Sequence, residues 1–424
     1  MPEASTLPPP PAAKPRPPAV DGGDSPPRVP LGEDHWAVEV RSPRDVGQVA
    51  AEWDDLTGHA AAANVFLDRE VFTAGWSAFG DPTPAGDPVS VVLIVRRPQA
   101  SQFPATPVGL FAVTEDRSLG RVAGPVLSLW SHDYAFDSTP LLREGHTADA
   151  VRCFLDWCEV ARPHCRLVRF DGVAAEGPLM RAVHERLSRR TAVTFEVERH
   201  NRALLRPRAS AESYIEAAVS ARTRRELRRQ ERRLREVGEV ETAVWTHAAD
   251  ADAFVDRFLA LEGRGWKGGT AMAGDAAAVG FFRRAVRSLA AADRFEGFEL
   301  TLDGRPVAMK ADFLSAPAAD GTVAGAAFKI AYDETFAKFS PGVMLELEAV
   351  RRLHETGRPH ALDSCAKASH PMIDRLWGDR AARTDFVVSL GGWRGDVALG
   401  VKQLLRWVQR RFRPRREDGT RTNF

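Results

Sequence analysis

Hydrophobic residues recur with two spacings along the chain, and these spacings predict a mixture of strands and helices. Period-two alternation and short apolar runs indicate strands, whereas apolar residues three or four positions apart indicate helices. The predicted strands are 36–40, 89–95, 108–113, 122–130, 165–170, 191–205, 240–246, 298–302, 307–313, 323–331, 360–363 and 384–390. The predicted helices are 42–56, one from 68 onward, 147–160, 177–188, 211–219, 221–237, 250–263, 275–292, one that begins at 340–341, 372–377 and 397–413.

The predicted elements repeat in the same order in the two halves of the chain. Each half gives a strand, two helices, antiparallel strands, a helix, a strand, a helix and a strand. This shared order predicts an α+β protein of two similar domains, each a mixed and mostly antiparallel sheet flanked by helices. We place the break near Pro207 and expect the domains to span 35–206 and 207–395.

The two ends of the chain differ from these halves. Residues 1–34 are rich in proline and nearly free of large apolar groups, so we expect a disordered tail. Residues 396–424 carry an amphipathic helix at 397–413 with a basic polar face, followed by a basic tail. We expect this helix to dock on the body of the protein, and contact with an anionic membrane surface is the alternative.

Composition and charge narrow the classes of function. The formal net charge is +1 over 424 residues, so no whole-protein field indicates a nucleic-acid partner. The four cysteines show no CxxC spacing, so we expect reduced thiols in a cytoplasmic protein, with neither a metal site nor disulfides. The chain has no apolar run of about 18 residues that would predict a membrane span, and its N-terminus lacks the apolar segment of a signal peptide.

The segment 323–363 joins an apolar strand to the start of a helix. Ser340 is a typical N-cap residue, Pro341 suits the first helical position, and Gly342 lets a ligand approach the backbone. Free amide groups and the positive end of the helix dipole make such a start an anion-binding site. An ordinary strand-to-helix turn uses the same residues, so both interpretations stay open.

The predicted helix 221–237 is crowded with arginine. This charge favours a surface for RNA, phosphate or a nucleotide cofactor. Three glutamates lie three or four positions from arginines and neutralise part of this charge, which is the pattern of a solvated helix. They are Glu226, Glu231 and Glu236. No aromatic residues are interleaved to stack bases, which weakens the case for nucleic acid. The arginines are Arg222, Arg224, Arg225, Arg228, Arg229, Arg232, Arg233 and Arg235.

Several short motifs follow one another between positions 220 and 380. They are the run 222–238, Arg264-Gly265-Trp266-Lys267-Gly268, Phe281-Phe282, the run 302–308, Tyr332-Asp333, Phe339-Ser340-Pro341-Gly342 and Asp363. Their order resembles the CelD-type acetyltransferase domain of the GNAT superfamily, which is related to the FemABX peptidyltransferases. The first half resembles the partner domain of tandem GNAT chains mainly through Asp133-Tyr134.

The resemblance implies two tandem GNAT-like domains and an acyl-CoA-dependent transferase that works by direct attack of the acceptor on the donor. It places the acyl-CoA pyrophosphate on the loop at a helix start between two splayed strands, here Phe339, Ser340, Pro341, Gly342 and Val343. Acetyl-CoA or another acyl-CoA would be the co-substrate, without a metal. FemABX relatives use aminoacyl-tRNA, so that donor is the alternative, and the arginine-rich helix would then contact tRNA.

Acyl transfer to an amine or a hydroxyl needs a base beside the aligned donor. Asp333, Asp363 and His370 are the candidates for this base. Asp363 follows a strand and is itself followed by polar residues, which is where functional side chains concentrate. The alternative for Asp363 is to cap the next turn, and the alternative for His370 is to cap the helix 372–377.

Lys329 stands alone in an apolar strand and needs a reason to be there. It could pair with Asp333 or Asp363, or bind donor phosphate. Strand alternation predicts that Lys329 points away from the face that carries Phe328 and Ile330.

Four residues are candidates for contacts with the acceptor. His132, Asp133 and Tyr134 would reach it from the first half across a cleft, or make only an interdomain hydrogen bond. Trp266 would stack on the acceptor, and core packing is its alternative. We expect an N- or O-acyltransferase that acts on a sugar or sugar-lipid precursor of an envelope polysaccharide or exopolysaccharide. A FemABX-like aminoacyl transferase and a non-catalytic GNAT-like protein of polysaccharide biosynthesis are the alternatives.

Overall fold

The computed structural model describes most of the chain. The described residues are 29–30, 36–80, 88–97, 105–117, 124–188, 194–264, 271–368, 370–390 and 400. Almost all of the predicted tail 1–34 and of the predicted helix 397–413 therefore lies outside the described residues. Within the tail, Val29–Pro30 forms a short strand, β1, that pairs with Val38 and Ala37, so the tail is not without structure throughout.

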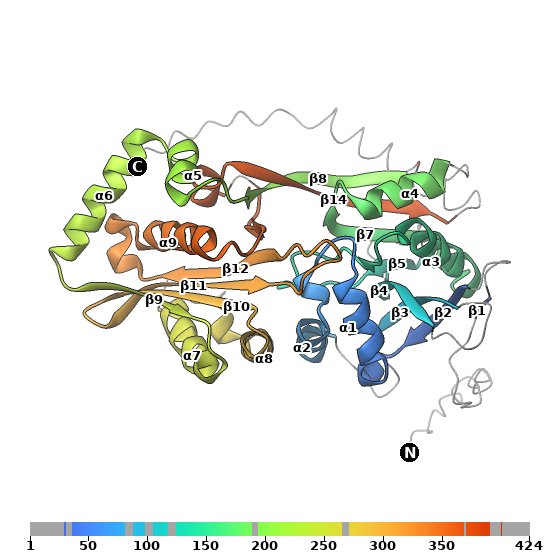
Figure 1. Cartoon of the computed structure of the whole chain (residues 1–424). Coiled ribbons are helices and arrows are strands. Elements are labelled where there is room, and N and C mark those ends of the chain that lie inside the picture. Colours follow the sequence, from blue (N-terminus) through green and yellow to red (C-terminus); the bar gives the residue numbers. More distant parts are fainter. Residues whose placement is uncertain are drawn as a thin grey trace, which may run out of the picture.

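The two halves follow one another along the chain and lie side by side (Figure 1). The first half consists of β2 Trp36–Arg41, η1 Pro43–Val49, α1 Ala50–Gly58, η2 Val65–Leu67, α2 Arg69–Phe79, β3 Val89–Arg96, β4 Thr106–Asp116, β5 Val126–Leu129, β6 Leu141–Leu142, α3 Thr147–Ala161, β7 Leu167–Ala174, α4 Pro178–Ser188 and β8 Thr194–Leu205. The second half begins with α5 Ala211–Ala218 and α6 Ala221–Arg235 and continues with β9 Val240–Trp245, η3 Ala248–Asp250, α7 Ala251–Glu262, η4 Met272–Gly274, α8 Ala276–Ala291, β10 Phe295–Leu302, β11 Arg305–Leu314, β12 Ala324–Tyr332, η5 Glu334–Phe339, α9 Pro341–Thr356, β13 Ala361–Asp363, η6 Ile373–Arg375 and β14 Asp379–Ser389.

The α+β class predicted from the sequence is confirmed, since helices flank a mostly antiparallel sheet in both halves. Among the described residues each half has one parallel pair of strands, β5 with β7 and β12 with β13. In each half the chain between the two parallel strands carries one long helix, α3 in the first and α9 in the second.

The last strand of each half crosses into the other half. β14 pairs with β7, and β8 pairs with β13, while β8 and β14 also pair with one another. The described strands therefore form one continuous sheet in the order β1-β2-β3-β4-β5-β7-β14-β8-β13-β12-β11-β10-β9, with β6 beside β4. The predicted break at Pro207 falls in the link between β8 and α5.

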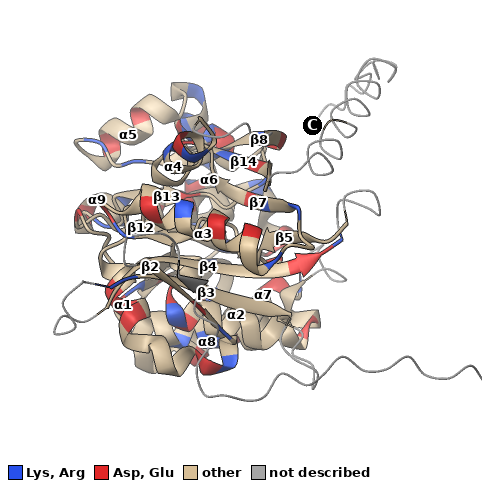
Figure 2. Ribbon diagram, turned by 90° about the vertical axis from the view of Figure 1, so that its right-hand side faces the viewer, with Lys and Arg blue, Asp and Glu red and all other residues tan. Residues whose placement is uncertain are grey.

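Helices cover both faces of this sheet. α9 lies between β12 and the β8–β14 pair, whereas α7 and α8 lie on the opposite side of β10–β12 (Figure 1). Charged residues lie mainly on the helices and loops in this view, and most of the strand residues are uncharged (Figure 2). On the side of α7 and α8, Phe254, Phe281 and Phe313 belong to one buried cluster that also takes in Phe66 of the first half.

Two local features illustrate how backbone geometry decides a turn. Asp303 and Gly304 turn the chain between β10 and β11, with φ of 50° and 75°, as a tight hairpin turn requires. Gly238 lies beyond α6, which ends at Arg235 with Glu236 as its C-cap. The Asp303 carboxylate lies where a Cβ on residue 238 would stand, so this glycine allows a close approach.

Candidate functional site

β12 extends beyond the end of its parallel neighbour β13. The two strands pair at Ala324–Ala361, Gly325–Leu362 and Ala326–Asp363, after which β13 ends and β12 continues to Tyr332. A β-bulge follows directly, because Ala311 and Asp312 of β11 face Lys329 and Ala327 and skip Phe328. A bulge leaves one residue without ladder partners and re-aims the side chains around it.

The bulge changes the face on which Lys329 lies. Phe328 stacks on Phe313 at 4.3 Å between ring centroids, on the side of α7 and α8. Lys329 lies on that same side, since its Nζ is 2.9 Å from Oε1 of Glu262 at the end of α7. Ile330 lies on the α9 side, near Gly342. The predicted alternation is therefore wrong for Phe328 and right for Ile330.

The predicted anion loop follows β12 at the start of α9. Ser340 occupies the N-cap position, but its side chain makes no cap hydrogen bond, contrary to prediction. Its left-handed backbone, with φ 54° and ψ 49°, presents the carbonyl instead, which accepts from the amides of Val343 and Met344 at 3.0 and 3.2 Å. Pro341 stands at the first helical position, as predicted. Gly342 is buried, and a Cβ there would meet its nearest neighbour, Tyr332, at 3.6 Å.

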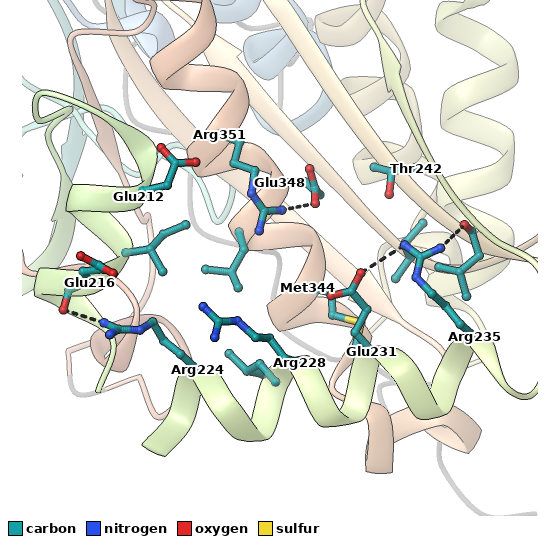
Figure 3. Close-up of a pocket in the computed structure, with 15 residues that line it drawn as sticks. Glu212, Glu216, Arg224, Arg228, Glu231, Arg235, Thr242, Met344, Glu348 and Arg351 are labelled. Atoms are coloured by element: carbon teal, nitrogen blue, oxygen red, sulfur yellow. Dashed lines mark hydrogen bonds and ion pairs between the residues drawn. The ribbon is translucent and has the colours of Figure 1, made fainter. Parts of the chain in front are cut away.

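A groove beside this loop separates α6 from α9 (Figure 3). Its volume is about 180 Å³, and its apolar lining includes Leu227, Leu300 and Met344. Arg224, Arg228 and Arg235 of α6 and Arg351 of α9 bring positive charge to it, and Glu212, Glu216, Glu231 and Glu348 bring negative charge. The arginine-rich helix thus turns part of its charge toward α9, and the rest faces solvent.

Among the residues that the structure describes, the side chains of Arg224, Arg235 and Arg351 have partners and that of Arg228 has none. Arg235 pairs with Glu231 at 3.1 Å, and Arg224 donates to the carbonyl oxygens of Glu216 and Val219. Outside the groove, Arg229 pairs with Glu226 at 2.7 Å, as the solvated-helix pattern predicted. Arg228 is exposed and projects into the groove between these groups (Figure 3).

Two of the three predicted bases are engaged in holding turns. Asp333 caps η5 by accepting from Thr335 N at 3.0 Å and pairs with Arg305 at 2.6 Å. Burial acts to raise the pKa of Asp333, but the hydrogen bonds from Thr335 and the charge of Arg305 hold that pKa below its usual value. His370 uses Nδ1 to accept from Ile373 N at 3.4 Å, in the turn before η6, which is the capping alternative.

Asp363 is enclosed by two arginines from the exchanged strands. Arg383 of β14 donates to it at 2.7 Å, and Nε of Arg202 of β8 lies 3.7 Å from its other oxygen. Burial acts to raise the pKa of Asp363, but the charges of Arg202 and Arg383 outweigh it and keep that pKa below its usual value. Arg383 also pairs with Asp137 of the first half at 2.5 Å. This geometry makes Asp363 a poor proton acceptor and a strong link between the halves.

The Lys329–Glu262 pair lies apart from all three predicted bases. Lys329 does not pair with Asp333 or Asp363; its partner Glu262 is buried, and the other Glu262 oxygen accepts from Met272 N at 3.0 Å. The Lys329 ammonium lies 5.3 Å from the ring centroid of Tyr134 and remains 17% exposed. A carboxylate and an ammonium are thus fixed beside the bulge of β12.

Tyr134 and His132 reach this place from the first half. The Tyr134 ring packs near Phe281 and Phe328 of the second half, at 6.1 and 6.2 Å. His132 stacks on Phe79 at 4.6 Å, and burial lowers its pKa to about 4, so the imidazole is neutral near pH 7. Asp133 is exposed, and Trp266 lies outside the described residues.

Sequence reasoning missed Glu262, Arg202 and Arg383. Glu262 is separated from Lys329 by two helices and two strands, so no spacing rule joins them. A partial signal was available in the helical pattern, because Glu262 stands in line with the apolar Phe258 one turn earlier, on the buried face of α7. The two arginines depend on the exchange of β8 and β14, which no local pattern predicts.

In the part of the chain that the structure describes, no helix is long and apolar enough to span a bilayer.

Comparison with known proteins gives one family assignment. Residues 221–370, from α6 to the turn before η6, match the model of the acetyltransferase (GNAT) domain. No curated protein sequence matches this chain. The family match includes β12, the start of α9, Glu262 and Lys329.

The solved structures that resemble the chain are distant in sequence. A conserved protein of unknown function from Bacteroides thetaiotaomicron has a TM-score of 0.49 and 12% identity over 83% of this chain and 98% of its own. L-PGS from Bacillus licheniformis has a TM-score of 0.43 and 11% identity over 86% and 98%. A tandem GNAT protein from the clavulanic acid biosynthesis pathway has a TM-score of 0.41 and 13% identity over 84% and 99%. At these values the likenesses say nothing about activity, so the firm assignment is that residues 221–370 are similar to the acetyltransferase (GNAT) domain.

Proposed function

We propose that this protein is an acyltransferase of the GNAT type that uses an acyl-CoA donor. The observation that carries the proposal is the end of β12, where the start of α9 lies on one face and the Lys329–Glu262 pair lies on the other. A donor that reaches the β12 bulge from the α9 side and an acceptor that arrives from the α7 side would meet there. This arrangement supports direct transfer within a ternary complex.

The donor phosphates would lie at the start of α9 and along the groove. The positive end of the α9 dipole favours an anion at residues 339–343. Arg228 projects into the adjoining groove, and its guanidinium can form paired hydrogen bonds with phosphate oxygens. The apolar lining, with Leu227 and Met344, would cover the less polar parts of the donor.

The acceptor would be activated by Glu262. Its carboxylate takes the proton as the amine or hydroxyl of the acceptor attacks the thioester carbon, the new C–N or C–O bond forms, and the C–S bond breaks to release CoA as a thiolate. The thiolate takes a proton from solvent, and Glu262 returns its proton to solvent. Lys329 would position the acceptor and hold Glu262 in place. Backbone amides at the bulge of β12, one residue of which lacks ladder partners, are the proposed hydrogen-bond donors to the carbonyl oxygen.

A sugar or sugar-lipid precursor is the proposed acceptor class, and a cytoplasmic enzyme is the proposed setting. Tyr134 supplies an aromatic ring beside Lys329, and such rings commonly stack on sugar faces. Asp133 and His132 belong to the same loop and remain candidates for acceptor contacts. The predicted membrane contact through helix 397–413 concerns residues outside the described part.

Calorimetric titration of the full chain with acetyl-CoA tests the donor site. We expect binding that is lost in Gly342→Glu, because a carboxylate at the start of α9 repels the donor phosphates while the site has room for a Cβ. Arg228→Glu should weaken binding strongly, and Arg225→Glu, an exposed change outside the groove, should not. Unchanged binding in Gly342→Glu and Arg228→Glu would show that acyl-CoA does not bind in this groove.

The aminoacyl-tRNA alternative is favoured by one observation, the exposed arginines of α6. Arg222, Arg225, Arg232 and Arg233 all face solvent. A tRNA bound along this helix would depend on Arg225 as much as on Arg228, and its affinity would fall steeply with salt. Equal losses in the two variants with aminoacyl-tRNA, and no heat with acetyl-CoA, would replace the first proposal by this one.

A further inference from the structure

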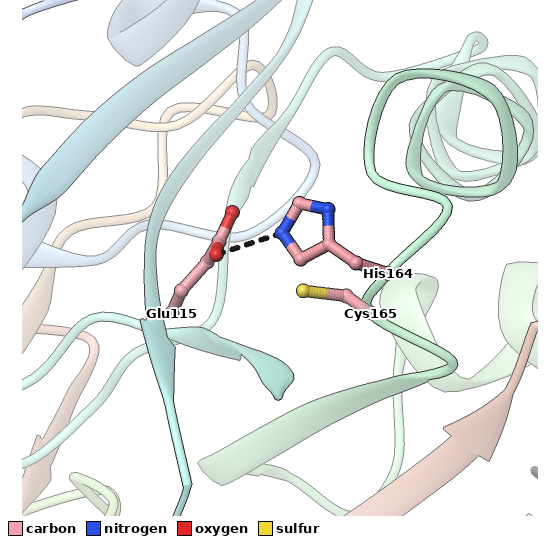
Figure 4. Close-up of side chains that lie close together, drawn as sticks. All are labelled: Glu115, His164 and Cys165. Carbon is pink, nitrogen blue, oxygen red and sulfur yellow. Dashed lines mark hydrogen bonds and ion pairs between the residues drawn. The ribbon is translucent and has the colours of Figure 1, made fainter. Parts of the chain in front are cut away.

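A histidine, a cysteine and a glutamate converge in the first half (Figure 4). The glutamate lies on β4, which β5, β7, β14, β8 and β13 separate from β12 in the sheet. His164 and Cys165 follow α3, and Glu115 lies near the end of β4. The Glu115 Oε2 to His164 Nε2 distance is 2.9 Å, and the Cys165 Sγ completes a set of three atoms that all lie within 4.8 Å of one another.

We propose that Glu115, His164 and Cys165 form a metal-binding site and that the bound ion is Zn²⁺. Imidazole nitrogen, thiolate sulfur and carboxylate oxygen are the donors that Zn²⁺ takes in proteins, whereas Mg²⁺ and Ca²⁺ prefer oxygen alone. Tetrahedral zinc separates neighbouring ligand atoms by about 3.5 Å, given bond lengths of about 2.0–2.3 Å. The observed spacing reaches that geometry through small side-chain rotations.

The backbone fixes the three donors from two directions. Glu115 is paired with Leu127 of β5 in the sheet, so its side chain starts from a rigid strand. Cys165 N donates to the carbonyl oxygen of Arg162 at 2.8 Å, which closes the turn after α3 and points two consecutive side chains toward β4. Cys165 is buried, while His164 and Glu115 are exposed, so a metal ion can reach the site from solvent.

One neighbouring cation competes with the metal. Nε of Arg162 lies 3.2 Å from Oε1 of Glu115, on the carboxylate oxygen that His164 does not contact. The two side chains are 32% and 39% exposed, so water partly screens this ion pair and a metal bond can replace it. With three protein donors, water would fill the fourth position, as in open zinc sites. The cysteine spacing did not predict this site because two of the three ligands are not cysteines and one is remote in sequence.

Titration of the chelator-treated full chain with Co²⁺ tests the site through a signal that needs a metal–sulfur bond. We expect one Co²⁺ per chain, a thiolate-to-cobalt absorption band in the near ultraviolet, and loss of that band when Zn²⁺ is added. His164→Gln and Glu115→Gln, both at exposed positions, should each weaken binding at least about tenfold. Cys165→Ser should abolish the band.

If Cys165→Ser fails to fold, the test still rests on one control variant and on the two exposed ligand variants. Cys153→Ala removes a buried thiol of α3 outside the cluster and should leave the band intact. Absence of a band in the unaltered protein would overturn the proposal. A band that persists undiminished in both His164→Gln and Glu115→Gln would overturn it as well, because cobalt would then be held elsewhere. Neither result bears on acyl-CoA binding.

Discussion

The two crossover helices, α3 and α9, occupy equivalent places in the two halves but pack in opposite ways. α3 meets its sheet through aromatic residues: the Phe154 ring stacks on Phe111 of β4 at 3.9 Å, and Trp157 is buried beside it. α9 meets its sheet partly through charge. Glu346 is buried against Lys310 and Asp312 of β11, with Lys310 Nζ at 2.6 Å from Asp312 and 3.4 Å from Glu346.

The difference extends to how each helix begins. The second half passes from β12 through η5 into α9 within a few residues, which puts a helix start directly at the end of the parallel pair. The first half inserts the longer segment 130–146 before α3, and that segment carries His132 and Tyr134 across to the second half. The same topology therefore gives the second half a short link into a helix start, and gives the first half a long segment that packs against the second half.

The largest expected effect comes from the Lys329–Glu262 pair. We predict that Glu262→Gln lowers kcat about 100-fold or more, in the range typical of a lost general base. Lys329→Met should also lower it, because Glu262 would lose its partner at 2.9 Å and the acceptor its positioning contact. The measurement is steady-state acyl transfer from acetyl-CoA to a panel of amino sugars.

A substitution far from β12 serves as the control for this activity test. Glu355 is exposed near the end of α9, so Glu355→Gln should leave kcat unchanged. Unaltered turnover in Glu262→Gln would show that the acceptor proton leaves by another route. It would also contradict the proposal that the donor binds on the α9 side of β12 and the acceptor on the α7 side.

The next largest effect concerns the strands that the halves exchange. Asp363→Asn leaves Arg202 and Arg383 without their shared counter-charge, so we predict a loss of about 3–5 kcal/mol in the free energy of unfolding, measured with denaturant. The lowered pKa of Asp363 means that its contribution persists above the unfolded pKa and is lost only as acid titrates the folded carboxylate. Asp333→Asn, whose partner Arg305 is half exposed, should cost much less. Equal losses in the two variants would contradict the link between halves.

Local patterns predicted the helices and strands well, because amphipathic spacing and turn residues act over short distances. The repeated order of elements followed from the same signals. The exchange of β8 and β14 could not be predicted, since alternation says which residues face a core and never which strand is the neighbour. The side-chain direction of Lys329 could not be predicted either, because the bulge of β12 places Lys329 on the same face of the sheet as Phe328. The local pattern also failed at Ser340, where a positive φ replaced the predicted side-chain cap.

A smaller expected effect concerns the charged core beneath α9, where Glu346 is buried. Burial raises the pKa of Glu346 to about 7 from 4.5, so the folded state favours the protonated acid. The resulting stability is complete below pH 4.5 and is lost as the pH rises toward 7. Glu346→Gln mimics the protonated acid, so we predict that it raises stability above pH 7, by at most about 3 kcal/mol, and not at pH 4.

Thermal unfolding between pH 4 and pH 8 measures the Glu346 effect. Lys310 lies 2.6 Å from Asp312, so this buried ammonium still has a carboxylate partner when Glu346 is replaced. Glu355→Gln again serves as the control on the same helix. A gain in stability that is the same at every pH would mean that Glu346 does not titrate in this range.

A comparable effect of opposite sign concerns His132, which packs against Phe281 of the second half. Burial lowers the pKa of His132 from 6.5 to about 4, so the folded state resists its protonation. Its contribution to stability is complete above pH 6.5 and is lost as the pH falls toward 4. His132→Phe keeps the stack on Phe79 and removes the titration, so the variant should lose less stability on acidification, by at most about 3 kcal/mol. The same unfolding series from pH 4 to pH 8 measures this. The stability that His132→Phe gains over the unaltered protein should grow as the pH falls, whereas the gain of Glu346→Gln should grow as the pH rises. Gains that change with pH in the same direction would contradict the pKa shift of one of the two groups.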